Sequence, residues 1–206
     1  ADLGGIDLVK GGVYGRDENN SVGKQGLNGW IFALLTLDTM GYKTPEGAEF
    51  DRERILDEIV SSQNTDGGFS LSKGESDIDI TAMALQAIAP YYNDFSRDDV
   101  RKRVDKAVEY LSGKQDSSGT FGSAEADSQV VIALCSLGID PEADNRFVKS
   151  SDLLTALLSY QNSDGGFSHE KGGDSDELAT GQALCALAAQ KRFELTMRRI
   201  YDMREE

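Results

Sequence analysis

The stretch QNTDGGF at positions 63–69 is the strongest indicator of the fold, because it returns almost letter for letter as QNSDGGF at 161–167 and more loosely as QDSSGTF at 115–121. Each copy has a Gln, a Gly four residues later and a Phe six residues later. The repeated residues are Gln63, Gly67, Phe69, Gln115, Gly119, Phe121, Gln161, Gly165 and Phe167. The Phe residues are separated by 121 − 69 = 52 and 167 − 121 = 46 positions. Periods of this size indicate stacked helix pairs or propeller blades.

The segments on either side of these loops distinguish between the two architectures. Before each Gln, the ranges 52–62, 100–113 and 151–160 carry apolar residues at i, i+3 and i+4 with a polar back, which predicts amphipathic helices. After each Phe, the ranges 80–89, 130–138 and 178–189 are rich in Ala and apolar nearly all round, which predicts helices buried on every side. The sequence therefore predicts helical hairpins.

One arrangement accommodates both kinds of helix: an all-α fold in which an outer ring of amphipathic helices covers an inner ring of apolar ones. We expect an α/α toroid, or an open part of one, with about four hairpins in the ranges 11–50, 51–99, 100–150 and 151–206. The first unit is degenerate and lacks the Gln. The repeated loops have a structural explanation, since Gly allows a positive φ at a sharp turn and Gln can bond free backbone groups. We expect one domain, which is a fragment of a larger protein.

The composition excludes several classes of partner. The 206 residues include 36 Asp and Glu against 21 Lys and Arg, a net charge of −15. Such a surface disfavours nucleic acid and anionic membranes, and no apolar run approaches the ~20 residues needed for membrane insertion. Cys135 and Cys185 are both expected in the core on equivalent turns of two inner helices. They are expected to be free thiols, because helix axes pack ~8–10 Å apart whereas a disulfide needs Cα atoms within ~7 Å.

The range 106–121, KAVEYLSGKQDSSGTF, resembles the QW repeat of squalene cyclases, with Phe in place of the usual Trp. Together with LNGWIFALLTLD (27–38) and SDIDITAMALQAIAPYYND (76–94), it makes nearly the whole chain similar to the prenyltransferase and squalene-oxidase repeat domains of large Gram-positive surface proteins. The resemblance implies an extracellular or cell-surface location in a Gram-positive bacterium. Its superfamily includes terpene cyclases, protein prenyltransferase β subunits, cobalamin carriers and complement thioester domains, so the fold does not define the function.

The resemblance suggests a chemistry for DIDITA at 77–82. Class II terpene cyclases protonate an alkene or epoxide with an Asp of a DxDD motif at the start of an inner helix. Here the last Asp of that motif is replaced by Ile80. By position, Asp79 would be the general acid and Asp77 its neighbour, because a nearby carboxylate raises the pKa of an acid and keeps it protonated.

Helix capping is the alternative explanation, since carboxylates in a first turn satisfy free N–H groups and the helix dipole. Aligning ALQA (84–87) with ALCA (183–186) compares the helix starts. The alignment places Asp77 opposite Asp176, Thr81 opposite Thr180 and Asp79 opposite Leu178, while Asp127 falls opposite Ile78. Acidic residues therefore recur as caps would, and Asp79 alone has no acidic counterpart.

Other chemistries of the superfamily lack their residues. A zinc site of the prenyltransferase type needs Asp, Cys and His together, and the only His is His169 in a glycine-rich loop. No GCGEQ-type thioester stretch is present. No metal and no cofactor is expected. Parallel inner helices would gather six carboxylates around one mouth of the ring, most simply as independent caps: Asp77, Asp79, Glu125, Asp127, Asp174 and Asp176.

Three functions follow from these observations. The first is a non-catalytic binding or scaffold module of a secreted or cell-surface protein, whose partner is an unknown small molecule or protein. Its central cavity would be lined by Trp30, Asp79, Thr81, Asp176 and Thr180. The second is an isoprenoid-processing enzyme with Asp79 as general acid. The third is a domain that captures a bulky cofactor of the cobalamin type. An incomplete arc has apolar flanks, which would allow self-association.

Overall fold

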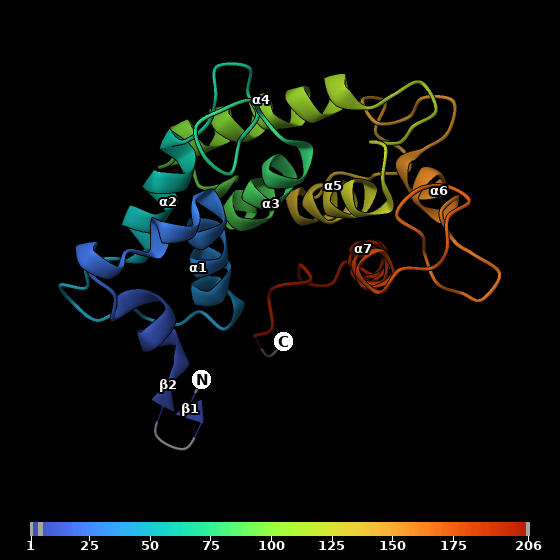
Figure 1. The fold of residues 1–206 in the computed structure, drawn as a ribbon. Coiled ribbons are helices and arrows are strands. Elements are labelled where there is room, and N and C mark those ends of the chain that lie inside the picture. The colour runs from blue at the N-terminus through green and yellow to red at the C-terminus, as the bar shows by residue number, and fades with distance from the viewer. Residues whose placement is uncertain (1, 4–5, 205–206) are drawn as a thin grey trace.

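The computed structural model describes residues 2–3 and 6–204, and its helices alternate between two layers (Figure 1). The inner layer holds α1 (Leu27–Thr39), α3 (Ile78–Ile88), α5 (Ala124–Leu137) and α7 (Glu177–Glu194). The outer layer holds α2 (Arg52–Ser61), α4 (Asp98–Lys114) and α6 (Leu153–Leu158). Along the inner layer, α1 packs on α3, α3 on α5 and α5 on α7. The predicted all-α toroid fold is confirmed; a short antiparallel pair, β1 (Asp2–Leu3) and β2 (Ile6–Asp7), precedes the helices.

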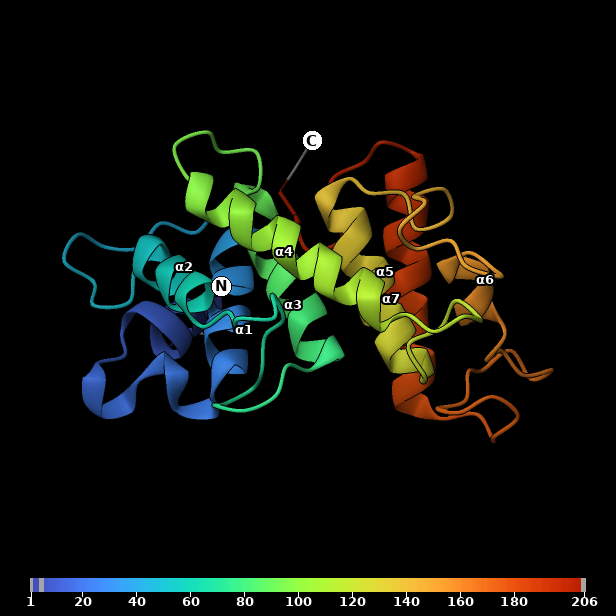
Figure 2. The same ribbon diagram turned by 90° about the horizontal axis from the view of Figure 1, so that it is seen from above.

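The inner helices lie side by side and run in the same direction, with α4 crossing in front of them (Figure 2). They follow an arc from α1 to α7, and the C-terminal segment returns from α7 along its inner side (Figure 1). Three hairpins are complete: α2 with α3, α4 with α5 and α6 with α7. Between the β1–β2 pair and α1, the chain forms three short helical turns, η1 (Lys10–Tyr14), η2 (Glu18–Asn20) and η3 (Val22–Gln25). The degenerate first unit therefore has an inner helix without a regular outer one.

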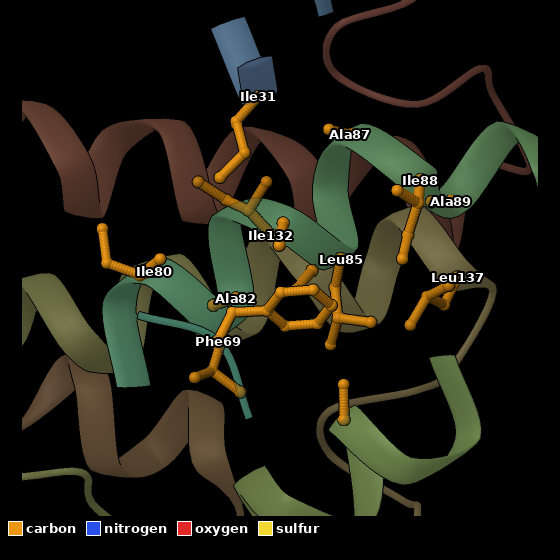
Figure 3. Close-up of a cluster of buried hydrophobic side chains, with 14 of the residues drawn as sticks. Ile31, Phe69, Ile80, Ala82, Leu85, Ala87, Ile88, Ala89, Ile132 and Leu137 are labelled. Atoms are coloured by element: carbon orange, nitrogen blue, oxygen red, sulfur yellow. The ribbon is translucent and has the colours of Figure 1, made fainter. Parts of the chain in front are cut away.

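The burial of side chains explains both the amphipathic pattern of the outer helices and the apolar pattern of the inner ones. The outer helix α2 buries Ile55, Leu56, Ile59 and Val60, which form the stripe seen in the sequence. The inner helices α3 and α5 are buried on nearly every side, and α3 contributes much of the cluster drawn in Figure 3. Each fully buried Leu, Ile or Phe side chain stabilises the fold by about 1.5–3 kcal/mol. These layers hold the starts of the inner helices in fixed positions. No helix of the described residues is long and apolar enough to cross a bilayer.

The repeated loops fasten each hairpin to the next. Gly67, Gly119 and Gly165 have φ values of 93°, 96° and 90°, as the turn chemistry predicts. At Gly67 a Cβ atom would also lie only 2.7 Å from the carbonyl oxygen of Lys106 in α4. The Gln63 amide donates to the carbonyl of its own loop at Gly67 (2.8 Å) and to a carbonyl of α4 (2.7 Å). Gln115 repeats this pattern at 2.9 Å and 2.9 Å, so the motif is structural in both loops.

The last hairpin departs from expectation in two ways. The helix α6 is shorter than the predicted range 151–160. The helix α7 is not buried all round, because Leu178 and Leu184 are 62% and 59% exposed. Cys185 is exposed as well, which corrects its assignment to the core, whereas Cys135 is buried as predicted. Both cysteines are free thiols, as expected. The difference arises because α7 ends the arc and has an inner neighbour on one flank only.

Candidate functional site

Three inner helices begin with the same cap. The Asp77 carboxylate accepts a hydrogen bond from the backbone N–H three residues on (2.9 Å), at the start of α3. The Ser123 hydroxyl does the same for α5 (3.1 Å), and the Asp176 carboxylate for α7 (2.8 Å). One acid of the DID sequence is therefore a helix cap. These caps also give a common origin from which equivalent positions in the three helices can be counted.

The fourth residue after each cap anchors the preceding loop. At this position Thr81 and Thr180 accept the backbone N–H of Phe69 and Phe167, each at 2.8 Å. In α5 the position is occupied by Asp127, whose carboxylate accepts the corresponding N–H at 2.6 Å. It also accepts the Thr120 hydroxyl at 2.9 Å and is fully buried. Burial raises the pKa of Asp127 to about 7, against the lowering effect of these hydrogen bonds.

Asp127 is therefore part of the packed interior and not of a carboxylate rim, which corrects the sequence alignment. The alignment had placed it opposite Ile78, whereas counting from the caps makes it the equivalent of Thr81. Thr81 itself is fully buried and lies in the interior too, whereas Thr180 is partly buried. Asp176 lies in the exposed start of α7 as its cap, and Asp174 is an exposed loop residue.

The second residues after the three caps differ from one another in type and in surroundings. In α3, α5 and α7 these residues are Asp79, Glu125 and Leu178. Asp79 is therefore opposite Leu178, as the alignment predicted, but Glu125 is its acidic counterpart, which the alignment missed. The Glu125 carboxylate contacts the ring Nδ1 of His169 at 2.9 Å, and this contact raises the pKa of that exposed His.

Asp79 differs from all of these carboxylates because one of its oxygens, Oδ1, is buried without a hydrogen-bond partner in the described part of the chain. Its pKa is raised to about 6, first by burial and then by the negative charges of Asp77 and Glu125. His169 opposes this shift. The corresponding residue of α1, Asn28, also buries an unpartnered side-chain oxygen.

This geometry suits proton donation. An acid with a pKa near 6 is protonated in a fraction of order one-tenth of molecules at pH 7, whereas an ordinary Asp is almost wholly ionised. No hydrogen bond within the described residues holds this carboxyl in its charged form. The cause of the raised pKa is burial beside like charges, which is how enzymes obtain neutral carboxylic acids near neutral pH.

A chain of glutamines crosses the inner layer deeper in the arc. The Gln86 amide of α3 donates to the Gln129 side chain of α5 at 2.8 Å, and Gln129 donates to Gln182 of α7 at 3.1 Å. The sequence analysis did not single out these residues. Their position in the sequence could have identified them, since Gln129 and Gln182 are both six residues after the caps of their helices. In α3 the same position is the partly buried Met83.

Trp30 does not line this region with Asp79. Its ring packs edge-on against Phe50, with centroids 5.4 Å apart, and lies directly beside Gly23. A cavity of about 770 Å³ lies on the flank of α1 against the N-terminal turns. It is lined by Val13, Val22 and Phe32 among others, but by neither Trp30 nor Asp79. The structure therefore separates these two candidates. In the described ranges 2–3 and 6–204, no group of three or more His, Cys, Asp or Glu side chains is arranged to hold a metal ion.

Comparisons with known proteins agree with this architecture. The model of the prenyltransferase alpha-alpha toroid domain matches residues 17–205. A curated relative, drimenyl diphosphate synthase from Streptomyces showdoensis, is 32% identical over 143 residues, covering 65% of this chain and 26% of the relative. The chain thus spans about a quarter of that relative's length.

Among solved structures, Candida albicans protein geranylgeranyltransferase-I complexed with GGPP is similar, with a TM-score of 0.60. The match has 19% identity and covers 92% of this chain and 57% of the other, so it supports the fold alone. The family model covers most of the chain, from the start of η2 to beyond α7. This chain therefore belongs to the prenyltransferase alpha-alpha toroid domain family.

Proposed function

We propose that this chain is the toroid of an isoprenoid-processing enzyme and that Asp79 is its general acid. The observation that supports this most directly is the unpartnered, buried Oδ1 of Asp79 together with its raised pKa. Capping and loop anchoring account for Asp77, Asp127 and Asp176, but neither accounts for Asp79. The relatives include two enzymes whose names refer to isoprenoid diphosphates or geranylgeranyl transfer, which favours this function over a non-catalytic module.

The reaction we propose is an acid-initiated cyclisation. The proton of Asp79 passes to one carbon of an alkene, so that a C–H bond forms, the π bond breaks and a tertiary carbocation remains beside the new carboxylate. The π bond of a second alkene in the same molecule attacks this cation, so that a C–C bond closes the ring and a new cation forms. Loss of a proton from that cation to water gives the product double bond, and Asp79 regains its proton from solvent. The net change is an isomerisation that needs no further reactant.

The residues around Asp79 suit this role in two respects. Met83 lies one helical turn further along the same face of α3 and offers a polarisable apolar surface to a hydrocarbon. The negative charges of Asp77 and Glu125 raise the pKa of Asp79, and they would stabilise positive charge formed nearby. A cell-surface location, inferred from the resemblance alone, stays a prediction.

Asp79→Asn tests the proposal. The protein is incubated with linear isoprenoid diphosphates such as geranylgeranyl diphosphate, and cyclic products are measured by mass spectrometry. The substitution is expected to lower turnover by about 100-fold or more, the usual contribution of a general acid. Asp176→Asn is the matched control, because Asn also caps helices and the residue is the cap of α7. It is expected to leave turnover unchanged.

Equal activity of the parent and Asp79→Asn proteins would contradict the proposal. A rise in melting temperature with an isoprenoid but no product would instead favour the binding module. If the parent turns over none of the substrates and no isoprenoid changes its melting temperature, the isoprenoid assignment is wrong as a whole.

A further inference from the structure

A second cavity lies at the opposite ends of the inner helices from Asp79. It has a volume of about 290 Å³ and is bounded by the C-terminal ends of α1, α3 and α5 and by the segment 199–204. This segment is the part of the chain that returns along the inner side of the arc in Figure 1. Its Met203 N–H donates to the Thr39 carbonyl at the end of α1 (2.8 Å), which fixes the segment over the cavity.

The two carboxylates that line this cavity are already paired. The Asp38 carboxylate accepts the Arg52 Nε–H at 2.7 Å and the Tyr91 hydroxyl at 2.8 Å. The Asp202 carboxylate accepts two hydrogen bonds from the Arg204 guanidinium, at 2.8 Å and 2.6 Å. Two arginines and two carboxylates therefore neutralise each other.

A third arginine of the lining, Arg199, has no such partner. In the described residues, no carboxylate lies within 4.0 Å of its guanidinium and no hydrogen bond from its side chain is recorded. The side chain is half-buried, and burial lowers the pKa of Arg199, against the weaker opposing effects of Asp202 and Asp38. An arginine remains charged in proteins, so its removal from water is unfavourable unless an anion accompanies it. This cation, which is unpaired in the described residues, belongs to a chain whose net charge is −15.

We propose that this cavity is an anion site in which Arg199 binds an oxyanion of a small molecule. The planar guanidinium matches two oxygens of a phosphate, diphosphate or carboxylate at once. The Tyr201 side chain lines the same cavity. Ser136 of α5 lines it too, but its hydroxyl already donates to the Ile132 carbonyl of its own helix at 2.7 Å, so Arg199 is the main donor considered for the anion. The volume, at the small end of ligand pockets of about 300–1,000 Å³, suits a compact anion or the anionic end of a longer molecule.

The anion site is distinct from the proposed acid site. Gln86 is the lining residue of α3 nearest to Asp79 along the helix, and it lies seven residues further on, a separation of about 10 Å at the rise of an α-helix. Asp79 is absent from its lining. The inference therefore stands independently of whether Asp79 is a catalyst.

Calorimetric titration at constant ionic strength tests the site, with sodium pyrophosphate, phosphate and acetate as probes. We expect saturable binding of at least one probe. Arg199→Gln is expected to weaken it by tenfold or more, and Arg199→Lys, which keeps the charge but loses the planar fork, by less. Lys191→Gln is the matched control, because it removes one positive charge from an exposed position of α7 outside the cavity. Tighter binding of pyrophosphate than acetate would identify a phosphoryl ligand, and the reverse a carboxylate.

The inference is overturned if none of the three probes binds saturably, or if Arg199→Gln and Lys191→Gln weaken binding equally. If Arg199→Gln unfolds the protein, the comparison rests on Arg199→Lys. If that variant binds the probe as tightly as the parent, the planar guanidinium of Arg199 has no role in binding. If Arg199 only stabilises the helix ends, its substitution lowers the melting temperature by the same amount with and without probe.

Discussion

The starts of α3 and α5 carry nearly the same acidic residues and use them differently. In α3 the cap is Asp77, the second residue after it is an unpartnered acid and the fourth is a buried Thr. In α5 the cap is Ser123, the second residue is an acid paired with His169 and the fourth is a buried Asp. The offset of a carboxylate from the cap therefore separates capping from loop anchoring, whereas at the second position the neighbouring residues decide whether the acid is paired, as Glu125 is, or left without a partner, as Asp79 is.

The anchoring position is where substitution should cost most stability. Asp127→Ala leaves the Phe121 N–H without its acceptor and leaves the Thr120 hydroxyl with the Tyr160 hydroxyl, at 2.7 Å, as its remaining partner. The free energy of unfolding should fall by about 1–3 kcal/mol per buried group left unsatisfied, measured by urea denaturation. Asp127→Thr introduces the residue that α3 and α7 use, and it should retain most of the parental stability. Equal losses in the two variants would show that the position in α5 is not equivalent to Thr81.

The caps should have a smaller effect, and they should be interchangeable. Asp77→Ala and Ser123→Ala each remove one side-chain acceptor and should each cost about 1 kcal/mol. Asp77→Ser should restore most of that loss, since the α5 helix is capped by Ser. A much larger loss from Asp77→Ala than from Ser123→Ala would mean that Asp77 does more than cap.

The unpartnered acid should give the protein a pH dependence that its Asn variant lacks. The pKa of Asp79 is raised from 3.8 to about 6, so the folded state binds this proton more tightly than the unfolded state. Relative to Asp79→Asn, the parent should therefore lose stability as pH rises from about 4 to 6 and stay level above that range. Denaturation curves of both proteins across these pH values measure the difference. A difference that does not vary with pH would mean that Asp79 titrates normally.

The smallest expected effect concerns the neighbouring acid. Glu125→Gln removes one of the two negative charges that raise the pKa of Asp79, so that pKa should fall. The pKa of His169 should fall too, because its raised value comes mainly from the same carboxylate. NMR titration of the Asp79 carboxyl carbon and of the His169 ring would follow both. An unchanged Asp79 pKa would show that burial and Asp77 alone set it.

The repeated Gln-Gly-Phe loops and the two helix patterns were enough to predict the hairpins and their layers, because both follow from local periodicity. The equivalence of Asp127 with Thr81 was not predictable in this way. The distance from the loop Phe to the cap is 77 − 69 = 8 residues in α3, 123 − 121 = 2 in α5 and 176 − 167 = 9 in α7. Alignment on the Ala-rich turns therefore lost the register in α5, and with it the counterpart of Asp79.

Other features depended on tertiary position. Cys135 and Cys185 have similar sequence surroundings, but only the first has an inner helix on both sides of its own helix. Likewise, Arg199 is one of several arginines near the C-terminus, and it is distinguished from Arg204 in the same cavity lining by having no carboxylate partner among the described residues. Asp79 was singled out from the sequence because it lacked an acidic counterpart, and Glu125 shows that this reason was wrong. Its buried, unpartnered Oδ1 depends on tertiary packing and could not be predicted from local sequence.

The arc also has a consequence for local unfolding of the native protein. In a one-dimensional stack each unit is stabilised only by its neighbours, so protection against hydrogen exchange should be graded along the chain. The backbone amides of α5, which lies between α3 and α7, should exchange most slowly. Those of α7, with a neighbour on one flank only, should open first, and the last hairpin should behave as a separate foldon whose opening leaves the Asp79 end of α3 intact.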